Sequence, residues 1–172
     1  MFLAPFVASP YPVVRRMLTL AEVKPGELLY DLGAGDGRIV IVAAKEFGAR
    51  AVGVELRSDL AKKAMQRVHE EGLDGKVKII NDDLFKVSIR EADVVTLYLT
   101  TSANSKVKGK LENELKKGAR VVSHDYEILG WKPIKAERFC ENPNLGYPTL
   151  SLIHISEPTR PRLISYAVFC LK

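Results

Sequence analysis

The sequence predicts an α/β protein with a doubly wound, mainly parallel Rossmann-like sheet in a single domain. Apolar, strand-like runs alternate with helical patterns along most of the chain, which is typical of βαβ units and a parallel sheet. A glycine-rich loop follows the first of these runs and opens a helix, which is where such sheets bind nucleotide-like ligands. The 172 residues suffice for one sizeable core, and no internal repeat divides them.

Strands and helices are predicted to alternate behind a proline-rich entry. In chain order the predicted elements are a helix over Val13–Leu20, a strand over Glu27–Asp31, a helix over Arg38–Phe47, a strand over Ala51–Glu55, a helix over Asp59–Glu71, strands over Val77–Asn81 and Asp93–Leu99, a helix over Ser105–Lys117, and strands over Ala119–His124 and Lys135–Glu141. The strands are short runs rich in apolar and β-branched residues, whereas the helices repeat apolar residues every three or four positions. Gly48, Gly72 and Gly118 end three of the helices, and Ser58 offers an N-cap.

Composition and charge exclude several classes of protein. Hydrophobic residues make up 47% and charged residues 27%, the balance of an ordinary globular domain. No apolar run reaches the roughly 18 to 20 residues that span a bilayer, and the first twelve residues lack the basic segment of a signal peptide. Two cysteines suit a reducing cytoplasm and form no metal cluster. We therefore expect a cytoplasmic protein with no membrane partner and no metal.

The segment 150–172 resembles translated sequencing-adapter DNA. Leu150–Arg160 matches one reading frame of a transposase-type adapter, and Ile164–Leu171 matches the end of that adapter in the same frame. We therefore expect residues 1–149 to form the domain and residues 150–172 to be an artefact. The segment contributes +2 to the formal charge of +5, so that residues 1–149 carry +3. This small excess is weak evidence for nucleic acid, which is not the favoured partner.

The most informative segment is the loop that ends the first predicted strand. Gly33, Gly35 and Gly37 occupy alternate positions, so that the backbone can turn sharply and approach a ligand closely. Glu55 ends the next predicted strand, at the distance expected for a carboxylate that binds a ribose.

The charges around this loop favour S-adenosylmethionine (SAM) over a dinucleotide. Asp31 precedes the loop and Asp36 lies within it. Two carboxylates would repel a pyrophosphate, whereas they suit the ammonium and sulfonium of SAM. Asp83, followed by Leu84 just past the third predicted strand, stands where an acid can accept a hydrogen bond from the adenine amino group. The alternative for Asp83 alone is a turn or a helix cap.

These residues resemble the class I (seven-strand) SAM-dependent methyltransferases, and more narrowly the small archaeal protein-lysine methyltransferases and their mitochondrial relatives. The matching segments are Pro5–Pro10, Val13–Leu18, Tyr30–Ile39, Ala51–Glu55, Arg120–Ile128 and Gly130–Trp131. The resemblance implies methyl transfer from SAM to a lysine of a protein substrate with exposed lysines. It also implies that the N-terminal segment folds over the cofactor, with Phe6 and Ser9 near SAM.

The resemblance further implies a seventh strand, antiparallel beside the fifth and sixth. Because the adapter junction falls inside it, we expect the native seventh strand to be truncated. The alternation over Tyr147–Ile155 is strand-like, and Leu150–Ile155 can occupy the same slot by accident.

The acceptor side is expected at the end of the fourth predicted strand. Tyr98, Leu99 and Thr100 stand where open α/β sheets bind ligands, and an apolar channel there would lower the pKa of an acceptor lysine. Tyr98 is the candidate catalytic residue, as the group that orients the acceptor; the alternative is an ordinary strand-end aromatic. His124 is expected to be a hydrogen-bonded structural residue. The remaining alternatives are an RNA or small-molecule methyltransferase, and a SAM-binding domain inactive through truncation.

Overall fold

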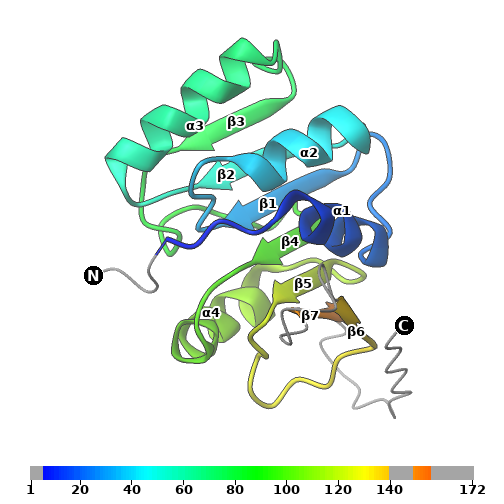
Figure 1. Cartoon of the computed structure of the whole chain (residues 1–172). Coiled ribbons are helices and arrows are strands. Elements are labelled where there is room, and N and C mark those ends of the chain that lie inside the picture. Colours follow the sequence, from blue (N-terminus) through cyan, green and yellow to red (C-terminus); the bar gives the residue numbers. More distant parts are fainter. Residues whose placement is uncertain (1–5, 140–148, 156–172) are drawn as a thin grey trace.

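A seven-stranded sheet with helices on both faces forms the body of the protein (Figure 1). The computed structural model describes residues 6–139 and 149–155. The helices are α1 (Tyr11–Leu20), α2 (Arg38–Glu46), α3 (Ser58–Glu70) and α4 (Thr101–Glu114). The strands are β1 (Leu28–Leu32), β2 (Arg50–Val54), β3 (Val77–Ile80), β4 (Val94–Leu97), β5 (Arg120–His124), β6 (Lys135–Phe139) and β7 (Thr149–Ile155).

The strand order is β3-β2-β1-β4-β5-β7-β6. Strands β1 to β5 pair in parallel, whereas β7 runs antiparallel to both β5 and β6. Successive strands are added on one side of β1 and then, from β4 onward, on its other side. The connections that follow β1 and β4 therefore leave in opposite directions, and a crevice lies between them at the carboxyl ends of these two strands. The predicted doubly wound, mainly parallel sheet is confirmed.

The two faces of the sheet bury separate apolar layers. Helices α1, α2 and α3 cover one face, where Val14, Val40 and Ala64 belong to the same buried cluster. Helix α4 covers the other face, and its Val107 and Leu111 share a second cluster with strand residues. The central strands β1 and β4 contribute buried residues to both layers, so their ends are held from both faces of the sheet. Among the helices in the described ranges, none is long and apolar enough to cross a membrane.

Helix α4 begins four residues before the predicted start at Ser105. The side-chain hydroxyl of Thr100 accepts a hydrogen bond from the backbone N–H of Ala103 at 3.3 Å, which caps the helix there. Strand β4 therefore ends at Leu97 rather than at Leu99. The expectation that Thr100 lines the acceptor channel is not met, since Thr100 is the N-cap residue and does not line the pocket described below.

The slot beside β5 is filled by β7. Its register with β5 runs from Arg120 opposite Ile155 to His124 opposite Ser151. Strand pairing uses backbone groups, so an alternating segment of suitable length can fill this slot whatever its origin. The expected strand is present over residues 149–155, whereas Tyr147, Pro148 and the end of the predicted sixth strand, residues 140–141, lie outside the described residues.

Candidate active site

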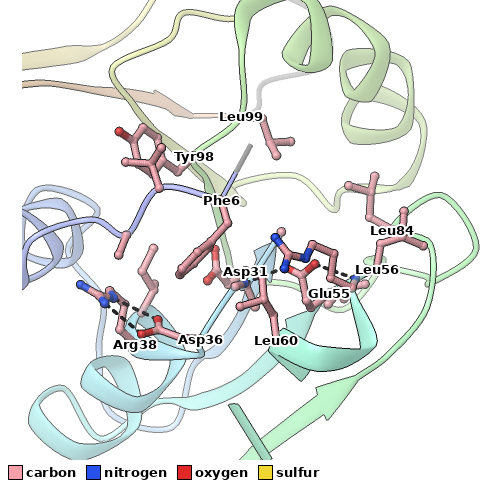
Figure 2. Close-up of a pocket in the computed structure, with 18 of the residues that line it drawn as sticks. Phe6, Asp31, Asp36, Arg38, Glu55, Leu56, Leu60, Leu84, Tyr98 and Leu99 are labelled. Atoms are coloured by element: carbon pink, nitrogen blue, oxygen red, sulfur yellow. Dashed lines mark hydrogen bonds and ion pairs between the residues drawn. The ribbon is translucent and has the colours of Figure 1, made fainter. Parts of the chain in front are cut away.

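A pocket of about 280 Å³ opens at the carboxyl ends of the central strands (Figure 2). It is lined by nine of the ten predicted cofactor-binding residues and by the candidate catalytic residue: Phe6, Ser9, Asp31, Gly33, Gly35, Asp36, Glu55, Asp83, Leu84 and Tyr98. In Figure 2, Leu56 and Leu84 lie on the Glu55 side of the pocket, whereas Tyr98 lies on the opposite side. The fold thus brings together residues that the sequence places in five separate segments.

The three glycines of the loop have different roles. Gly33 and Gly35 line the pocket with positive φ angles of +92° and +55°. A Cβ at Gly35 would lie 2.4 Å from Cε2 of Phe6, so the ring of Phe6 rests directly on the loop. Gly37 is the residue that does not line the pocket. It is the N-cap of α2, and a Cβ there would lie 3.0 Å from Cβ of Ala64, so Gly37 allows α2 to pack against α3.

Asp31 is a buried carboxylate at the floor of the pocket. Its Oδ1 accepts a hydrogen bond of 2.7 Å from the hydroxyl of Thr96, its neighbour across the β1–β4 pair. Burial raises the pKa of Asp31 to about 7, and the nearby carboxylates of Glu55 and Asp36 add to this shift. Burial and repulsion both disfavour the ionised form of Asp31. A cation in the pocket would offset both effects, because it would pair with the ionised carboxylate.

Glu55 directly follows β2 and is held by two backbone amides. Its Oε2 accepts from the N–H of Gly35 and its Oε1 from the N–H of Arg57, both at 2.8 Å. Each carboxylate oxygen has two acceptor positions, so both can still accept a hydroxyl of a ribose. The first of these bonds also ties the glycine loop to β2. The position and orientation of Glu55 therefore fit the predicted ribose contact.

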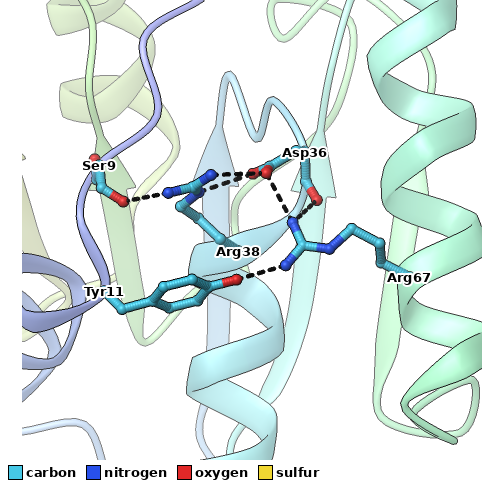
Figure 3. Close-up of polar contacts among 5 residues, drawn as sticks. All are labelled: Ser9, Tyr11, Asp36, Arg38 and Arg67. Atoms are coloured by element: carbon cyan, nitrogen blue, oxygen red, sulfur yellow. Dashed lines mark hydrogen bonds and ion pairs between the residues drawn. The ribbon is translucent and has the colours of Figure 1, made fainter.

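Asp36 is paired with two arginines in a network that reaches the N-terminal segment (Figure 3). Its Oδ2 lies 2.9 Å from Nη2 of Arg38 and 2.8 Å from Nη1 of Arg67. Arg38 also donates to the carbonyl of Ser9 at 2.7 Å, and Arg67 donates to the hydroxyl of Tyr11 at 2.6 Å. Burial alone would raise the pKa of Asp36, but the hydrogen bonds and charges of the arginines hold it below its usual value.

This network changes one part of the sequence interpretation. The sequence suggested that Asp31 and Asp36 together attract a cationic ligand. In the structure the charge of Asp36 is balanced by Arg38 and Arg67, so of the loop's two carboxylates only Asp31 is left to attract a cationic ligand. Asp36 instead fastens the N-terminal segment, which carries Phe6, against the glycine loop.

Asp83 and Leu84 lie on the connection that follows β3. Oδ1 of Asp83 accepts from the backbone N–H of Phe85 at 3.0 Å, so the turn role considered as its alternative is present. Asp83 also lines the pocket, together with the apolar side chains of Leu56, Leu60 and Leu84. A flat apolar group bearing one amino group fits between these side chains and the acid.

The opposite side of the pocket is formed by Tyr98, which packs on a buried histidine. The ring of His124 lies 4.0 Å from that of Tyr98, and its Nδ1 lies 2.9 Å from the hydroxyl oxygen of Ser9. Burial lowers the pKa of His124, so its imidazole is neutral near pH 7. Burial raises the pKa of Tyr98 to about 12, so its hydroxyl keeps its proton. His124 is thus buried and hydrogen-bonded, as expected.

Three residues of the site carry no signal in the sequence. Thr96 contacts Asp31 only because β1 and β4 pair in register, although 65 residues separate them. Arg67 reaches Asp36 from α3, and Tyr11, at the start of α1, accepts a hydrogen bond from Arg67. A pattern search for acid–base pairs at helical spacing would not find these contacts, since each joins different elements.

The donor set fits SAM. A buried carboxylate with a raised pKa suits a cationic amino-acid end, and the glycine loop leaves room for it beside the backbone. Glu55 suits the ribose hydroxyls, and the apolar side chains next to Asp83 suit the adenine. No group of three or more His, Cys, Asp and Glu side chains in the described part of the chain is placed to hold a metal ion.

Comparison with known proteins agrees with this geometry. Residues 31–135 match the family model of the ANTKMT methyltransferase domain. A protein-lysine N-methyltransferase from Saccharolobus islandicus (strain REY15A) is 48% identical over 130 residues, which cover 75% of this chain and 81% of that protein. The adenine nucleotide translocase lysine N-methyltransferase of Mus musculus is 37% identical over 131 residues, which cover 76% of this chain and 56% of the mouse protein.

A solved structure shares nearly the whole fold. The crystal structure of an RNA methyltransferase from Salinibacter ruber in complex with S-adenosyl-L-homocysteine superposes with a TM-score of 0.82 at 42% identity. The match covers 92% of this chain and 99% of that one. The bound S-adenosyl-L-homocysteine of this relative is the product that SAM leaves after methyl transfer.

Proposed function

The chain belongs to the family of the ANTKMT methyltransferase domain and is a SAM-dependent methyltransferase, and we propose that its acceptor is the side-chain amine of lysine in a protein. The observation that carries the proposal is the relation, at 48% identity over 81% of its length, to a protein named for protein-lysine methylation. The mouse relative, of which this chain spans just over half, is also named for a lysine acceptor.

We assign the cofactor contacts to the side chains around the pocket. Asp31 pairs with the amino-acid end of SAM, and Gly33 and Gly35 let the backbone approach it. Glu55 accepts hydrogen bonds from the ribose, and Asp83 accepts one from the adenine amino group.

Phe6, Ser9 and Leu84 complete the cofactor site. Leu84 forms part of the apolar wall beside Asp83, and the N-terminal segment with Phe6 and Ser9 covers the cofactor. The Asp36–Arg38–Arg67 network holds this segment in place.

The chain's contribution to the chemistry is to orient the acceptor and to exclude water. SAM, when bound, would supply a sulfonium-bound methyl group that a neutral amine can accept, with the neutral thioether S-adenosyl-L-homocysteine as the leaving group. A lysine amine has an unperturbed pKa near 10.4, so it must lose its proton before it can react. Leu99 and Tyr98 form a partly buried wall that lowers this pKa by desolvation. The Tyr98 hydroxyl, which keeps its proton, orients the amine and does not act as a base.

The proposal is tested by transferring labelled methyl groups from SAM into an extract of Saccharolobus islandicus, followed by protease or ribonuclease. We expect protease-sensitive label that is recovered as methyl-lysine after hydrolysis. Ribonuclease-sensitive label would overturn the lysine acceptor and favour RNA, the substrate class named for the Salinibacter ruber relative. The Asp31→Asn variant is the inactive control, and Asp74→Asn removes an exposed carboxylate away from the pocket.

We also propose that residues 1–149 are the native domain and that residues 150–172 are adapter-derived. Support comes from the two blocks that match the adapter in one frame. Sequencing the source locus tests this: native codons that continue as these residues would overturn it. If the protein binds SAM but transfers no methyl group, recovery of activity on replacing 150–172 by a relative's strand would identify truncation as the cause.

For location and source we propose a cytoplasmic protein of archaeal origin. The low cysteine content and the resemblance to small archaeal enzymes support this. The same sequencing of the source locus identifies the organism.

A further inference from the structure

The carboxyl end of β5 lies one strand beyond the pocket and presents an acid followed by a tyrosine. The pocket residues follow β3, β2, β1 and β4 in their order across the sheet, and Tyr98 comes from the last of these strands. Asp125 and Tyr126 follow β5, the next strand along the same edge. They therefore stand beside Tyr98, on the side away from Glu55 and Asp83.

Side-chain contacts join these residues to Tyr98. The hydroxyl of Tyr98 lies 3.5 Å from Oδ2 of Asp125, and the rings of Tyr98 and Tyr126 lie 6.4 Å apart at an interplanar angle of 29°. Asp125 keeps 34% of its side chain exposed, and Tyr126 is 39% exposed. A carboxylate, a hydroxyl and an accessible aromatic ring thus meet at the edge of the pocket.

The backbone at Asp125 is strained. Asp125 has a φ of +61°, and the N–H of Tyr126 donates to the carbonyl of His124 at 2.7 Å, the i to i+2 pattern of a γ-turn. A γ-turn whose central residue has positive φ is rare, and strain of this kind is concentrated at functional sites. The turn aims the Asp125 carboxylate back toward Tyr98.

Two buried side chains hold the turn from beneath. Nδ2 of Asn104 donates to the carbonyls of Tyr126 and Glu127 at 3.0 and 3.3 Å, and to the hydroxyl of Ser123 at 3.2 Å. Ser123 in turn donates to the carbonyl of Tyr126. Both side chains are fully buried, so a buried polar network keeps this exposed turn in one conformation.

The chemistry of the cluster suits a primary ammonium. A carboxylate attracts the charge, and an aromatic face stabilises a cation within about 6 Å of its centre. His124, which faces Asp125 with Nε2 at 3.6 Å from Oδ2, is neutral near pH 7 because burial lowers its pKa, so it does not cancel the carboxylate's charge. The incoming lysine, by contrast, carries a full positive charge at this pH.

We propose that Asp125, together with Tyr98 and Tyr126, binds the ammonium of the acceptor lysine before it enters the pocket. This inference rests on the proposed function. Asp125 and Tyr126 are specificity-determining residues for a cationic acceptor, and Asn104, Ser123 and His124 are positioning residues that act through the turn. The carboxylate holds the protonated amine at the pocket edge, and the amine loses its proton to solvent on moving past Tyr98.

The test is an Asp125→Asn variant, with Glu127→Gln as the matched control. Asparagine tolerates positive φ and keeps the size of the side chain, whereas the charge is lost. Glu127 is an exposed acid two residues away that does not line the pocket, so its change alters the net charge equally. With the protein fraction of the extract as substrate, we expect the apparent KM for protein to rise roughly tenfold in Asp125→Asn and to stay unchanged in Glu127→Gln.

The affinity for SAM separates this role from a structural one. We expect Kd for SAM in Asp125→Asn within twofold of wild type, roughly the precision of the measurement. Tyr126→Leu should raise KM about threefold, and Tyr126→Phe should rescue most of that loss because it keeps the ring.

The possible failures of this test have different meanings. An unchanged KM in Asp125→Asn, or an equal rise in Glu127→Gln, would overturn the inference while leaving lysine methylation standing. A parallel loss of SAM affinity would also overturn it, since the turn would then act only through the fold. If wild-type protein places label in RNA, or none in protein, the proposed function itself fails and the inference with it.

Discussion

The two halves of the pocket edge hold their acids in opposite ways. On the cofactor side, Asp31 is buried and Glu55 accepts hydrogen bonds from two backbone N–H groups, so both carboxylates are held in place. On the acceptor side, Asp125 stands on a strained turn and is one-third exposed. A cofactor that is the same in every turnover suits a rigid, enclosed site, whereas a protein substrate needs an accessible one. The difference predicts that variants will separate into two classes.

The largest expected effect on the cofactor side comes from Asp31→Asn. Asparagine has the same shape and can still accept the hydrogen bond of Thr96, but it cannot pair with a cation. We expect Kd for SAM to rise on the order of 100-fold or more, since the cation of SAM would then be buried without its partner, which costs several kcal/mol. Isothermal titration calorimetry checks this. An affinity near that of wild type would show that the pocket does not use the Asp31 charge.

The buried carboxylate should also make the ligand-free protein less stable as the pH rises. The pKa of Asp31 is about 7 in the folded protein, against an ordinary value of 3.8. As the pH rises, Asp31 therefore loses its proton in the unfolded chain at a lower pH than in the folded protein. The stabilising contribution of the protonated group is therefore complete below about pH 4 and is lost as the pH rises through about 7.

Asp31→Asn has no such group. The free energy of unfolding of wild type relative to this variant should fall by roughly 4 kcal/mol between pH 4 and 8. Urea titrations at several pH values measure it, with Asp74→Asn as the baseline. A difference that does not change with pH would contradict a raised pKa for Asp31.

A smaller effect on the cofactor side is expected from Gly35→Ala. The new Cβ would lie 2.4 Å from the ring of Phe6, at a φ of +55° that alanine adopts at a cost of roughly 1 to 2 kcal/mol. We expect Kd for SAM to rise about tenfold, with the apparent KM for protein unchanged. Gly75→Ala is the control, because no atom lies within 4 Å of a Cβ built there. Equal effects in the two variants would show that close approach at Gly35 is unimportant.

The same division explains what the sequence could and could not predict. The glycine loop is one continuous segment, and Glu55 ends the next strand, so spacing alone indicated both. The Asp125 turn depends on Asn104, which α4 brings beneath β5 after a helix start that the sequence placed four residues too late. The partner of Asp31, Thr96, depends on the register of two strands. Contacts between elements distant in the chain leave no local pattern, which is why the acceptor side was predicted only at residues 98–100, after the fourth predicted strand, and not at Asp125.

Ser9 contacts both halves of the pocket edge. Removing its hydroxyl should therefore have the smallest effect of these variants, but one that appears both in Kd for SAM and in the apparent KM for protein. Its carbonyl accepts from Arg38 in the cofactor network, and its hydroxyl lies 2.9 Å from Nδ1 of His124, the residue beneath Tyr98. Ser9→Ala removes only the hydroxyl contact, a loss of about 1 kcal/mol. We expect about a threefold rise both in Kd for SAM and in the apparent KM for protein.

Tyr11→Phe is the matched comparison, since it loosens the same segment through Arg67 without touching His124. It should move Kd for SAM alone. If Ser9→Ala also moves only Kd, the halves are independent, and the hydrogen bond to His124 serves the N-terminal segment and not the acceptor. If both quantities move together, the segment that covers the cofactor also sets the position of Tyr98, so that closing over SAM prepares the site for its lysine.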